Sequence, residues 1–244
     1  MKIKGKIALV TGGAKRIGNE IALGLASKGA HVVITYLHSK KEAQVTVKKL
    51  KRYGVKAHAI QADQSRAHDV NRVFREVMAR FKRLDILVNS AANYLKTPFT
   101  ELTENDFNRS VDTNLKGPYL YAITFGKEML KRRSGKIIHI GDWGIFRPYN
   151  DYLPYFVSKG GVATLTKALA KALAPFVQVN AILPGPMMLP EGTSARERQA
   201  IIRETPLKRI GSPRDIAAAV EFLIEGSDFI TGALLPVDGG RSIQ

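Results

Sequence analysis

Short apolar runs and longer segments of helical periodicity alternate along the whole chain. Runs of about four to eight apolar residues bounded by glycine, proline or polar residues are typical of buried strands, whereas apolar positions three and four residues apart predict amphipathic helices. Because each strand is followed by a helix, the pattern predicts a Rossmann-type α/β fold with a doubly wound parallel sheet. We expect strands at residues 6–10, 31–36, 55–61, 84–88, 137–140, 177–183 and 233–237.

Length and composition favour one domain. A chain of 244 residues with 45% hydrophobic and 24% charged side chains is large enough for one well-buried α/β domain and short for two. We expect residues 1–244 to form this domain, without a linker or an internal repeat. Residues 186–212 precede a helix that begins near Pro213, and we expect them to form a mobile loop over the ligand.

One strand, loop and helix carry the candidate chemistry. Asp142 follows the strand at 137–140, and the next helix holds Tyr155 and Lys159 four residues apart, on one face. An ammonium beside a phenol favours the phenolate, so we expect Lys159 to lower the pKa of Tyr155 from its ordinary value of about 10. Asp142 lies where open α/β sheets bind ligands, and it could supply or relay a proton. The same spacing also fits a surface Tyr–Lys pair without chemistry.

A glycine-rich turn follows the first strand. It runs from Thr11 to Gly18 with the sequence TGGAKRIG, and a helical pattern comes next. Glycines let a backbone approach a pyrophosphate closely, and a helix N-terminus offers it free N–H groups. Tight turning and helix–strand packing would explain the glycines equally well if the turn stood alone. After a first strand, the turn predicts a dinucleotide site built from Gly12, Lys15, Arg16, Ile17 and Gly18.

The end of the second strand indicates which dinucleotide is bound. NAD-selective sites usually carry an acidic residue there, which binds the ribose hydroxyls. This chain has none: Tyr36, His38 and Ser39 lie there instead, followed by two lysines. Hydroxyl and cationic groups suit a 2′-phosphate, so we expect NADPH rather than NADH. The two lysines also fit solvated residues that open the next helix.

Polar and small residues follow the third and fourth strands. Asp63 could accept the adenine amino group or cap the next helix. The segment from Asn89 through Ala91 carries small side chains that leave room for a ligand beside the backbone, and Tyr94 could stack on a flat substrate. These residues extend the expected site along the sheet edge.

Two residues further along are ambiguous. Asn114 lies inside a helical stretch at 103–131, although asparagine is a poor helix-interior residue, so it marks either a functional irregular turn or a surface position. Met187 could adapt to a substrate or simply pack the loop.

Composition and charge exclude several other classes. The net charge of +17 comes from 38 Lys and Arg against 21 Asp and Glu, but the basic residues are scattered, so we expect a solvated basic surface rather than a nucleic-acid partner. Without cysteine there is no disulfide, thiolate zinc site or cysteine nucleophile, and we predict no metal site. Neither a signal peptide nor an apolar run of roughly 18 residues is evident, so we expect no membrane partner and a cytoplasmic location.

Taken together, these motifs resemble the short-chain dehydrogenase/reductase family over essentially the full length. They are the Thr11–Gly18 turn, Asn89, Asn114, Tyr155 with Lys159, Pro184-Gly185 and the terminal Asp238-Gly239-Gly240. The resemblance implies that Tyr155 is the acid/base, that Lys159 lowers its pKa and binds the nicotinamide ribose, and that Asn114 holds a water in a proton relay. It also implies that Pro184 and Gly185 bind the cofactor and that the protein is a homotetramer. We hypothesise that Arg241 reaches the active site of an adjacent subunit.

Departures from the family pattern favour one branch. Asp142 stands where most members have serine, and Arg16 stands where most have glycine, a combination that resembles the pteridine and dihydromonapterin reductases. The resemblance implies a small-molecule substrate, a dihydropterin whose C=N bond accepts hydride from NADPH, with Tyr155 and Asp142 as proton donors. It further implies that Tyr94 and the nicotinamide sandwich the pterin, while Arg16 binds its anionic edge.

Two alternatives stay open. An NADPH-dependent carbonyl reductase, acting on a 3-oxoacyl thioester or another ketone, would use the same Tyr155 but would be served better by a hydroxyl donor than by an ionised Asp142. A non-catalytic dinucleotide-binding regulator would leave the acid/base residues without a purpose.

Overall fold

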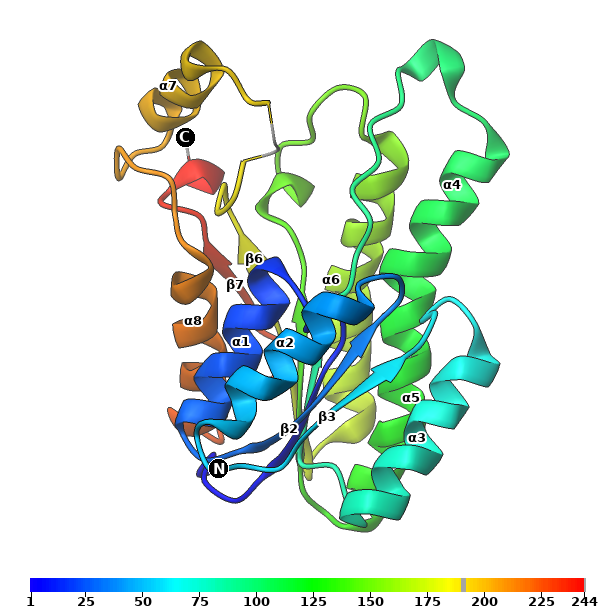
Figure 1. Ribbon diagram of the computed structural model, residues 1–244. Coiled ribbons are helices and arrows are strands. Elements are labelled where there is room, and N and C mark those ends of the chain that lie inside the picture. The colour runs from blue at the N-terminus through cyan, green and yellow to red at the C-terminus, as the bar shows by residue number, and fades with distance from the viewer. Residues whose placement is uncertain (190–191, 244) are drawn as a thin grey trace.

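A fully parallel sheet forms the centre of the molecule (Figure 1). The structure is a computed structural model and describes residues 1–189 and 192–243. The seven strands lie in the order β3-β2-β1-β4-β5-β6-β7, which confirms the predicted doubly wound Rossmann-type sheet. The strands are β1 (Ile7–Val10), β2 (His31–Tyr36), β3 (Ala57–Gln61), β4 (Ile86–Asn89), β5 (Gly135–Ile140), β6 (Val177–Pro184) and β7 (Leu234–Val237).

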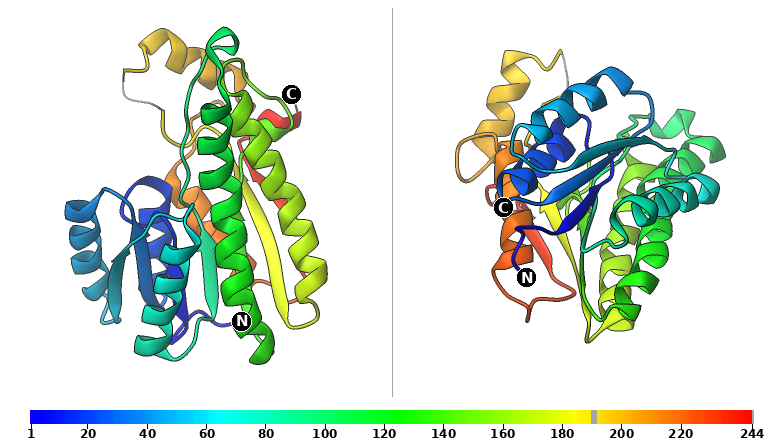
Figure 2. Two further views of the ribbon diagram at one scale, coloured as in Figure 1. Left: turned by 90° about the vertical axis from the view of Figure 1, so that its right-hand side faces the viewer. Right: turned by 60° about the horizontal axis from the view of Figure 1, so that its bottom comes forward.

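Helices cover both faces of the sheet (Figures 1 and 2). One layer places α1 between α2 and α8, and the other places α5 between α3 and α6. Each connection between successive parallel strands contains one or two helices, as such a sheet requires. The helices are α1 (Arg16–Ser27), α2 (Lys40–Lys51), α3 (Ala67–Phe81), α4 (Glu104–Val111), α5 (Gly117–Lys131), α6 (Leu153–Leu173), α7 (Ala195–Glu204) and α8 (Pro213–Glu225).

The two faces of the sheet bury separate hydrophobic cores. Successive side chains of a strand point to opposite faces. In β1, Ala8 and Val10 therefore join the core under α1, α2 and α8, whereas Ile7 and Leu9 join the core under α3, α5 and α6. Burial on both faces explains why the strand runs are continuously apolar.

The helical stretch predicted at 103–131 is interrupted at the position of its asparagine. A π-helical turn, η2 (Asp112–Lys116), joins α4 to α5 and contains Asn114. The Asn114 side chain is buried, so the surface alternative is wrong and the irregular turn is correct. Such wide turns often occur at functional sites because they redirect one side chain out of the regular helix.

The segment 186–212 contains a helix. Its Pro190 and Glu191 lie outside the described residues. Residues 195–204 form α7, which the expected loop did not include; the mobility of the segment and its position over a ligand stay predictions. A reciprocal capping box between Ser194 and Glu197 starts this helix.

The described residues contain neither a membrane-spanning helix nor a metal-binding cluster. None of their helices is long and apolar enough to cross a lipid bilayer. Among the same residues, no three His, Asp or Glu side chains converge as a metal site would require.

Candidate active site and cofactor groove

The glycine-rich turn lies against the loop that follows β4. Gly12 adopts a positive φ of 64°, and a Cβ added to it would lie 2.8 Å from the Ala91 Cα atom. A Cβ on Gly18 would lie 2.6 Å from the Gly12 carbonyl oxygen. The Thr11 hydroxyl accepts hydrogen bonds from the backbone N–H groups of Ser90 and Ala91, at 2.9 and 3.0 Å. Only glycine fits these two close approaches, so the turn is held tightly at the carboxyl end of β1.

A groove of about 570 Å³ runs along the carboxyl ends of the N-terminal strands and is bounded by α4 on its other side. Open α/β sheets bind ligands in such crevices, outside the strand ends. The structure brings five predicted cofactor-binding residues together in its lining: Gly12, Tyr36, His38, Asp63 and Ala91.

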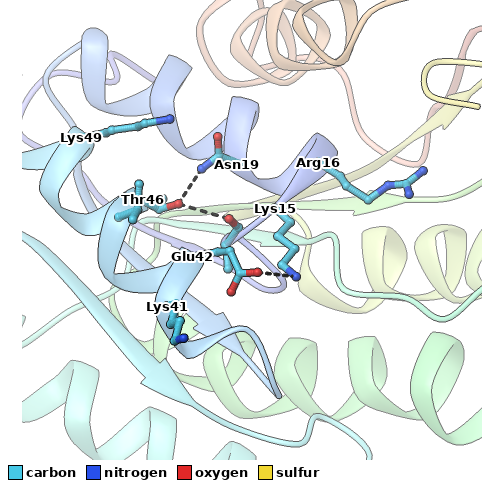
Figure 3. A pocket seen from close by; sticks show the side chains of 9 residues that line it. Lys15, Arg16, Asn19, Lys41, Glu42, Thr46 and Lys49 are labelled. Carbon is cyan, nitrogen blue, oxygen red and sulfur yellow. Dashed lines mark hydrogen bonds and ion pairs between the residues drawn. The ribbon is translucent and has the colours of Figure 1, made fainter. Parts of the chain in front are cut away.

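Two predicted cofactor-binding cations line a separate cavity of about 440 Å³ between α1 and α2 (Figure 3). The Lys15 ammonium lies 2.7 Å from the Glu42 carboxylate, and both side chains are half-exposed. Glu42 is a partner that the sequence analysis missed. Arg16 points away from this pair, and its Nη2 donates to the Met188 carbonyl oxygen at 3.4 Å.

The remaining predicted residues of this region have backbone or packing roles. Ile17 is partly buried and packs against the core. Ser39 directly precedes α2, where its carbonyl oxygen accepts from the Ala43 N–H. The Asn89 side chain is buried inside the sheet, where its amide lies 3.2 Å from the His139 ring, rather than facing the groove. Burial, with Lys159 nearby, lowers the pKa of His139 to about 3, so this ring is neutral.

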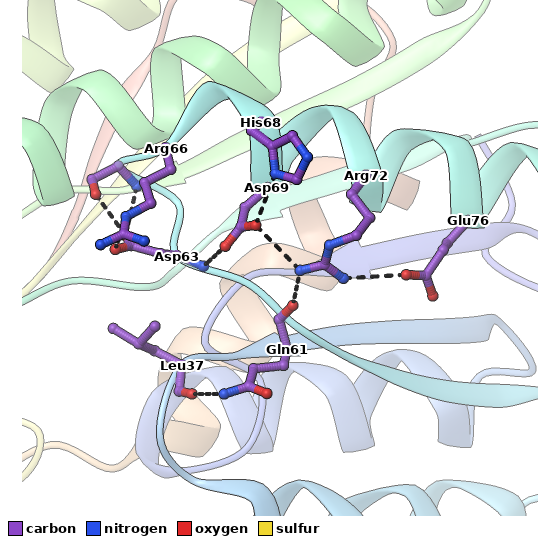
Figure 4. Close-up of polar contacts among 9 residues, drawn as sticks. Leu37, Gln61, Asp63, Arg66, His68, Asp69, Arg72 and Glu76 are labelled. Carbon is purple, nitrogen blue, oxygen red and sulfur yellow. Dashed lines mark hydrogen bonds and ion pairs between the residues drawn. The ribbon is translucent and has the colours of Figure 1, made fainter.

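Asp63 organises the turn before α3 (Figure 4). Its carboxylate accepts from the N–H and hydroxyl groups of Ser65, at 3.0 and 2.6 Å. The Asp63 N–H donates to Asp69 at 2.8 Å, and this bond holds the pKa of the Asp69 carboxyl down. The N-cap position of α3 is Arg66 and has no side-chain cap, so the prediction of Asp63 as the helix cap is wrong. The adenine role stays a prediction.

The candidate reaction centre forms where β5 and α6 meet. The Tyr155 hydroxyl donates to Asp142 Oδ2 at 2.7 Å, and the Gly144 N–H donates to Asp142 Oδ1 at 2.7 Å. The Lys159 ammonium donates to the Ile140 carbonyl oxygen at 2.8 Å and lies 5.7 Å from the centre of the Tyr155 ring. Tyr155 and Lys159 are both buried, which excludes the surface-pair alternative.

Burial controls the protonation of this centre. It raises the pKa of Tyr155 well above its usual value, and the adjacent Asp142 charge raises it further. It also raises the pKa of Asp142, against the opposing hydrogen bonds from Tyr155 and Gly144. Burial lowers the pKa of Lys159 to about 8, with Asp142 opposing the shift. The net shift of the Tyr155 pKa is therefore upward, opposite to the expected direction, because desolvation and the Asp142 contact outweigh the effect of the Lys159 ammonium.

Asn114 connects three segments around this centre. Its side-chain amide donates to Ser158 Oγ at 3.2 Å and to the Asn93 carbonyl oxygen at 3.1 Å, while its oxygen accepts from the Asn93 N–H at 2.9 Å. Ser158 in turn donates to the Tyr155 carbonyl oxygen at 2.6 Å. Asn114 thus fixes the β4 loop against α6; its role in a water relay stays a prediction. Sequence reasoning missed Ser158, although it lies one turn from Tyr155.

Aromatic side chains wall the centre. Tyr94 stacks on Tyr152 with ring centres 4.3 Å apart, and it meets Tyr155 nearly edge-on at 4.7 Å. Tyr149 contacts Trp143 at 5.6 Å. Tyr152 already covers one face of Tyr94, so at most the other face is available to a flat ligand. The spacing of three between Tyr149, Tyr152 and Tyr155 was the sequence signal for this wall, and it was overlooked.

The end of β6 is packed against the C-terminal strand. Pro184 is the last residue of β6, and a Cβ added to Gly185 would lie 2.5 Å from the Asp238 Cα atom. The Asp238 carboxylate accepts from the N–H groups of Gly240 and Ser242, which shapes the terminal turn. Met187 is buried in the hydrophobic core, which favours the packing alternative; its contact with a substrate stays a prediction.

Comparison with known proteins gives consistent matches. The sequence model of the family described as enoyl-(acyl carrier protein) reductase matches residues 12–242. The chain is 36% identical over 244 residues to 3-oxoacyl-[acyl-carrier-protein] reductase FabG of Staphylococcus epidermidis, covering 96% of this chain and 98% of that protein.

Solved structures agree with these sequence matches. A blue fluorescent protein from a metagenomic library, in complex with NADPH, superposes with a TM-score of 0.91 at 31% identity, covering 99% of both chains. A variant of actinorhodin polyketide ketoreductase with NADPH gives a TM-score of 0.92 at 30% identity, covering 98% of both chains. The chain therefore belongs to the short-chain dehydrogenase/reductase family.

Proposed function

We propose that this protein is an NADPH-dependent reductase that protonates its substrate with Tyr155. The observation that carries the proposal is the Tyr155 hydroxyl, held 2.7 Å from Asp142 at the strand ends and close to the buried Lys159 ammonium. A non-catalytic regulator would have no use for these buried polar groups, whose desolvation is costly.

The groove fits a dinucleotide. The missing Cβ atoms of Gly12 and Gly18 leave the turn compact enough for a pyrophosphate to approach the backbone and the start of α1. Tyr36 and His38 line the groove, and the turn after β2 that carries them has no acidic residue, which favours a phosphorylated ribose. Lys15 and Arg16 would supply positive charge near it. The NADPH complexes of two relatives support the same cofactor, which supplies a hydride when bound.

Tyr155 is suited to act as the acid. Its raised pKa keeps the phenol protonated at neutral pH, so the proton is available for an oxygen or nitrogen that gains negative charge. To donate, the hydroxyl would turn from Asp142 to the substrate atom. The Lys159 ammonium, fixed by the Ile140 carbonyl oxygen, would stabilise the phenolate left behind.

We propose a carbonyl compound, such as a 3-oxoacyl thioester or another ketone, as the substrate. The names of the FabG relatives and of the polyketide ketoreductase support this class. Burial raises the pKa of Asp142, which favours its protonated form, and in that form the carboxyl would donate a hydrogen bond to a carbonyl oxygen. Hydride would reach the carbonyl carbon, and the Tyr155 proton would reach the oxygen.

A dihydropterin is the second candidate. The direct bond between Tyr155 and Asp142 favours it, since such a pair could protonate the nitrogen of a C=N bond. The exposed Tyr94 at the edge of the same centre also suits a flat ring.

One assay separates the two candidates. NADPH oxidation is measured with an acetoacetyl thioester and with dihydrobiopterin, for the wild type and for Asp142→Ser. The carbonyl proposal predicts thioester turnover that Asp142→Ser retains, because serine also offers a hydroxyl donor. Turnover of dihydrobiopterin alone, abolished by Asp142→Ser while NADPH still binds, would replace it with the pterin candidate. A wild type that binds NADPH but oxidises it with neither substrate would contradict both.

We also propose that the chain folds as one domain and that four copies of it assemble into a homotetramer. Apolar side chains of α5 and α6 that are half-exposed in the single chain, Tyr119 and Val157 among them, support an intersubunit contact on these helices. Light scattering on the purified protein tests this, and a monomer of 26.9 kDa would contradict it.

A further inference from the structure

Helix α7 covers the carboxyl-end side of the sheet without joining its core (Figure 1). None of its residues is buried. After the helix, the Leu207 N–H donates to the Gly239 carbonyl oxygen at 3.1 Å, which ties the segment to the C-terminal turn. At the other end, hydrogen bonds from Ser194 lower the pKa of Glu197, and the Lys96 charge lowers it further. Helix α7 is therefore anchored at the terminal turn.

Arg241 is the side chain that joins this helix to the reaction centre. Its Nη1 donates to the Ile201 carbonyl oxygen at 3.1 Å, and its Nη2 lies 2.9 Å from the Glu204 carboxylate. The guanidinium carbon lies 4.9 Å from the centre of the Trp143 ring. Although it is an arginine near the chain end, its side chain is only 13% exposed. The structure therefore directs Arg241 to its own chain, which differs from the hypothesis of a role in an adjacent subunit.

Trp143 links this contact to the catalytic carboxyl. It follows Asp142 directly, and the next residue, Gly144, donates its N–H to Asp142 Oδ1. The Trp143 ring is buried and also contacts Tyr149 of the aromatic wall. A shift of Trp143 would therefore move both Asp142 and the wall.

A helix with no buried residue depends on a few contacts for its position. Arginine is suited to this task, because its planar group can hydrogen-bond along its edge while its face stacks on an aromatic ring. Arg241 does both at once, and its partial burial makes these contacts stronger than those of exposed ion pairs. The contacts at Ile201 and Glu204 hold α7, and the contact at Trp143 holds the turn beside Asp142.

We propose that Arg241 is a positioning residue that clamps α7 to the Trp143 turn, and so keeps the helix over the Asp142–Tyr155 centre. The clamp itself is independent of the reaction, whereas its effect on turnover rests on the proposed function. Loss of the clamp releases α7, exposes Trp143 and weakens substrate binding more than cofactor binding.

Trp143 is the only tryptophan of the chain, so its fluorescence reports on the clamp directly. Acrylamide quenching is measured for the wild type, for Arg241→Ala and for Arg198→Ala, which removes the same charge from an exposed position of α7. We expect the quenching constant to rise about threefold in Arg241→Ala and to stay unchanged in Arg198→Ala. Subtilisin should cleave between residues 192 and 212 faster in Arg241→Ala than in the wild type, and at the wild-type rate in Arg198→Ala. Mass spectrometry of the fragments identifies the cleavage sites.

A second variant keeps the test decisive if Arg241→Ala fails to fold. Glu204→Gln weakens the hold on α7 but leaves Arg241 on the indole, so cleavage should accelerate while quenching stays near that of the wild type. The clamp would be overturned if Arg241→Ala folds and shows unchanged quenching and cleavage. If only Glu204→Gln folds, unchanged cleavage in that variant would overturn it.

Kinetics test the functional effect separately. With any substrate that the wild type reduces, KM should rise about tenfold in Arg241→Ala while NADPH affinity changes less than about twofold. An unchanged KM beside increased quenching would leave the clamp intact but remove its role over the reaction centre. Absence of turnover in the wild type would instead count against the proposed function, and the fluorescence result would stand.

Discussion

The cofactor groove and the reaction centre of this protein are built in different ways. The groove depends on backbone atoms, because Gly12 and Gly18 leave no room for a Cβ atom against their neighbours. The reaction centre depends on side chains from distant segments, with Asp142 after β5, Tyr155 on α6 and Tyr94 after β4. A backbone site is encoded in one short motif, whereas a side-chain site is complete only after folding. Changes in the two regions should therefore separate cofactor binding from turnover.

The largest expected effect belongs to Tyr155→Phe. Removing the hydroxyl takes away the proton donor, so kcat should fall by about 10² to 10⁴ while the fold persists. Stopped-flow or steady-state NADPH oxidation measures this loss. A variant with kcat within about threefold of the wild type would show that another group supplies the proton.

Gly12→Ala probes the backbone region. The added Cβ would lie 2.8 Å from Ala91 in a residue with a φ of 64°, so NADPH affinity should fall by about 10- to 100-fold. Gly54→Ala is the matched control, because Gly54 has a φ of 76° but nothing within 4 Å of an added Cβ. Fluorescence titration with NADPH compares them. Equal losses in both variants would mean that backbone strain, rather than the approach to Ala91, determines binding.

The pH dependence of turnover probes the side-chain region. Lys159 has a pKa lowered to about 8, so its ammonium loses a proton as pH rises through that value. The support of the Tyr155 phenolate is then lost, and kcat/KM should fall about tenfold per pH unit above this point. A profile that stays flat to pH 10 would show that Lys159 remains charged or has no electrostatic role.

The smallest expected effect belongs to Glu42→Gln, a change in the cavity between α1 and α2. Glu42 holds the Lys15 ammonium at 2.7 Å and would compete with a 2′-phosphate for it. Glu42→Gln should therefore strengthen NADPH binding about two- to fivefold, without changing NADH binding. Glu101→Gln, an exposed change of the same charge, is the control. Equal gains for NADPH in both variants would indicate a general charge effect.

The difference between sites built from one local motif and sites built from side chains of several segments also explains what could be predicted from the sequence. The apolar runs located all seven strands to within about two residues, and in β1, β4 and β5 burial on both faces leaves a continuous signal. Helix α7 was missed because none of its residues is buried, although the Ser194–Glu197 capping box was visible in the sequence. The pairing of Asp142 with Tyr155 followed from their places after a strand and on a helix. The direction of the Tyr155 pKa did not, because desolvation depends on surrounding side chains that no motif contains.

Long-range contacts were the least predictable part of the site. Lys15 meets Glu42 across two helices, and Arg241 near the C-terminus meets Trp143 in the middle of the chain. Neither pair has a local spacing rule, so only the fold reveals them.

The most direct test of the central claim compares wild type with Tyr155→Phe in two measurements on the same samples: NADPH binding by fluorescence titration and NADPH oxidation with an acetoacetyl thioester or dihydrobiopterin. We predict that both proteins bind NADPH with affinities within about fivefold of each other and that only the wild type turns over. Comparable turnover by Tyr155→Phe, or a wild type that binds NADPH and reduces neither substrate, would contradict the proposed reductase.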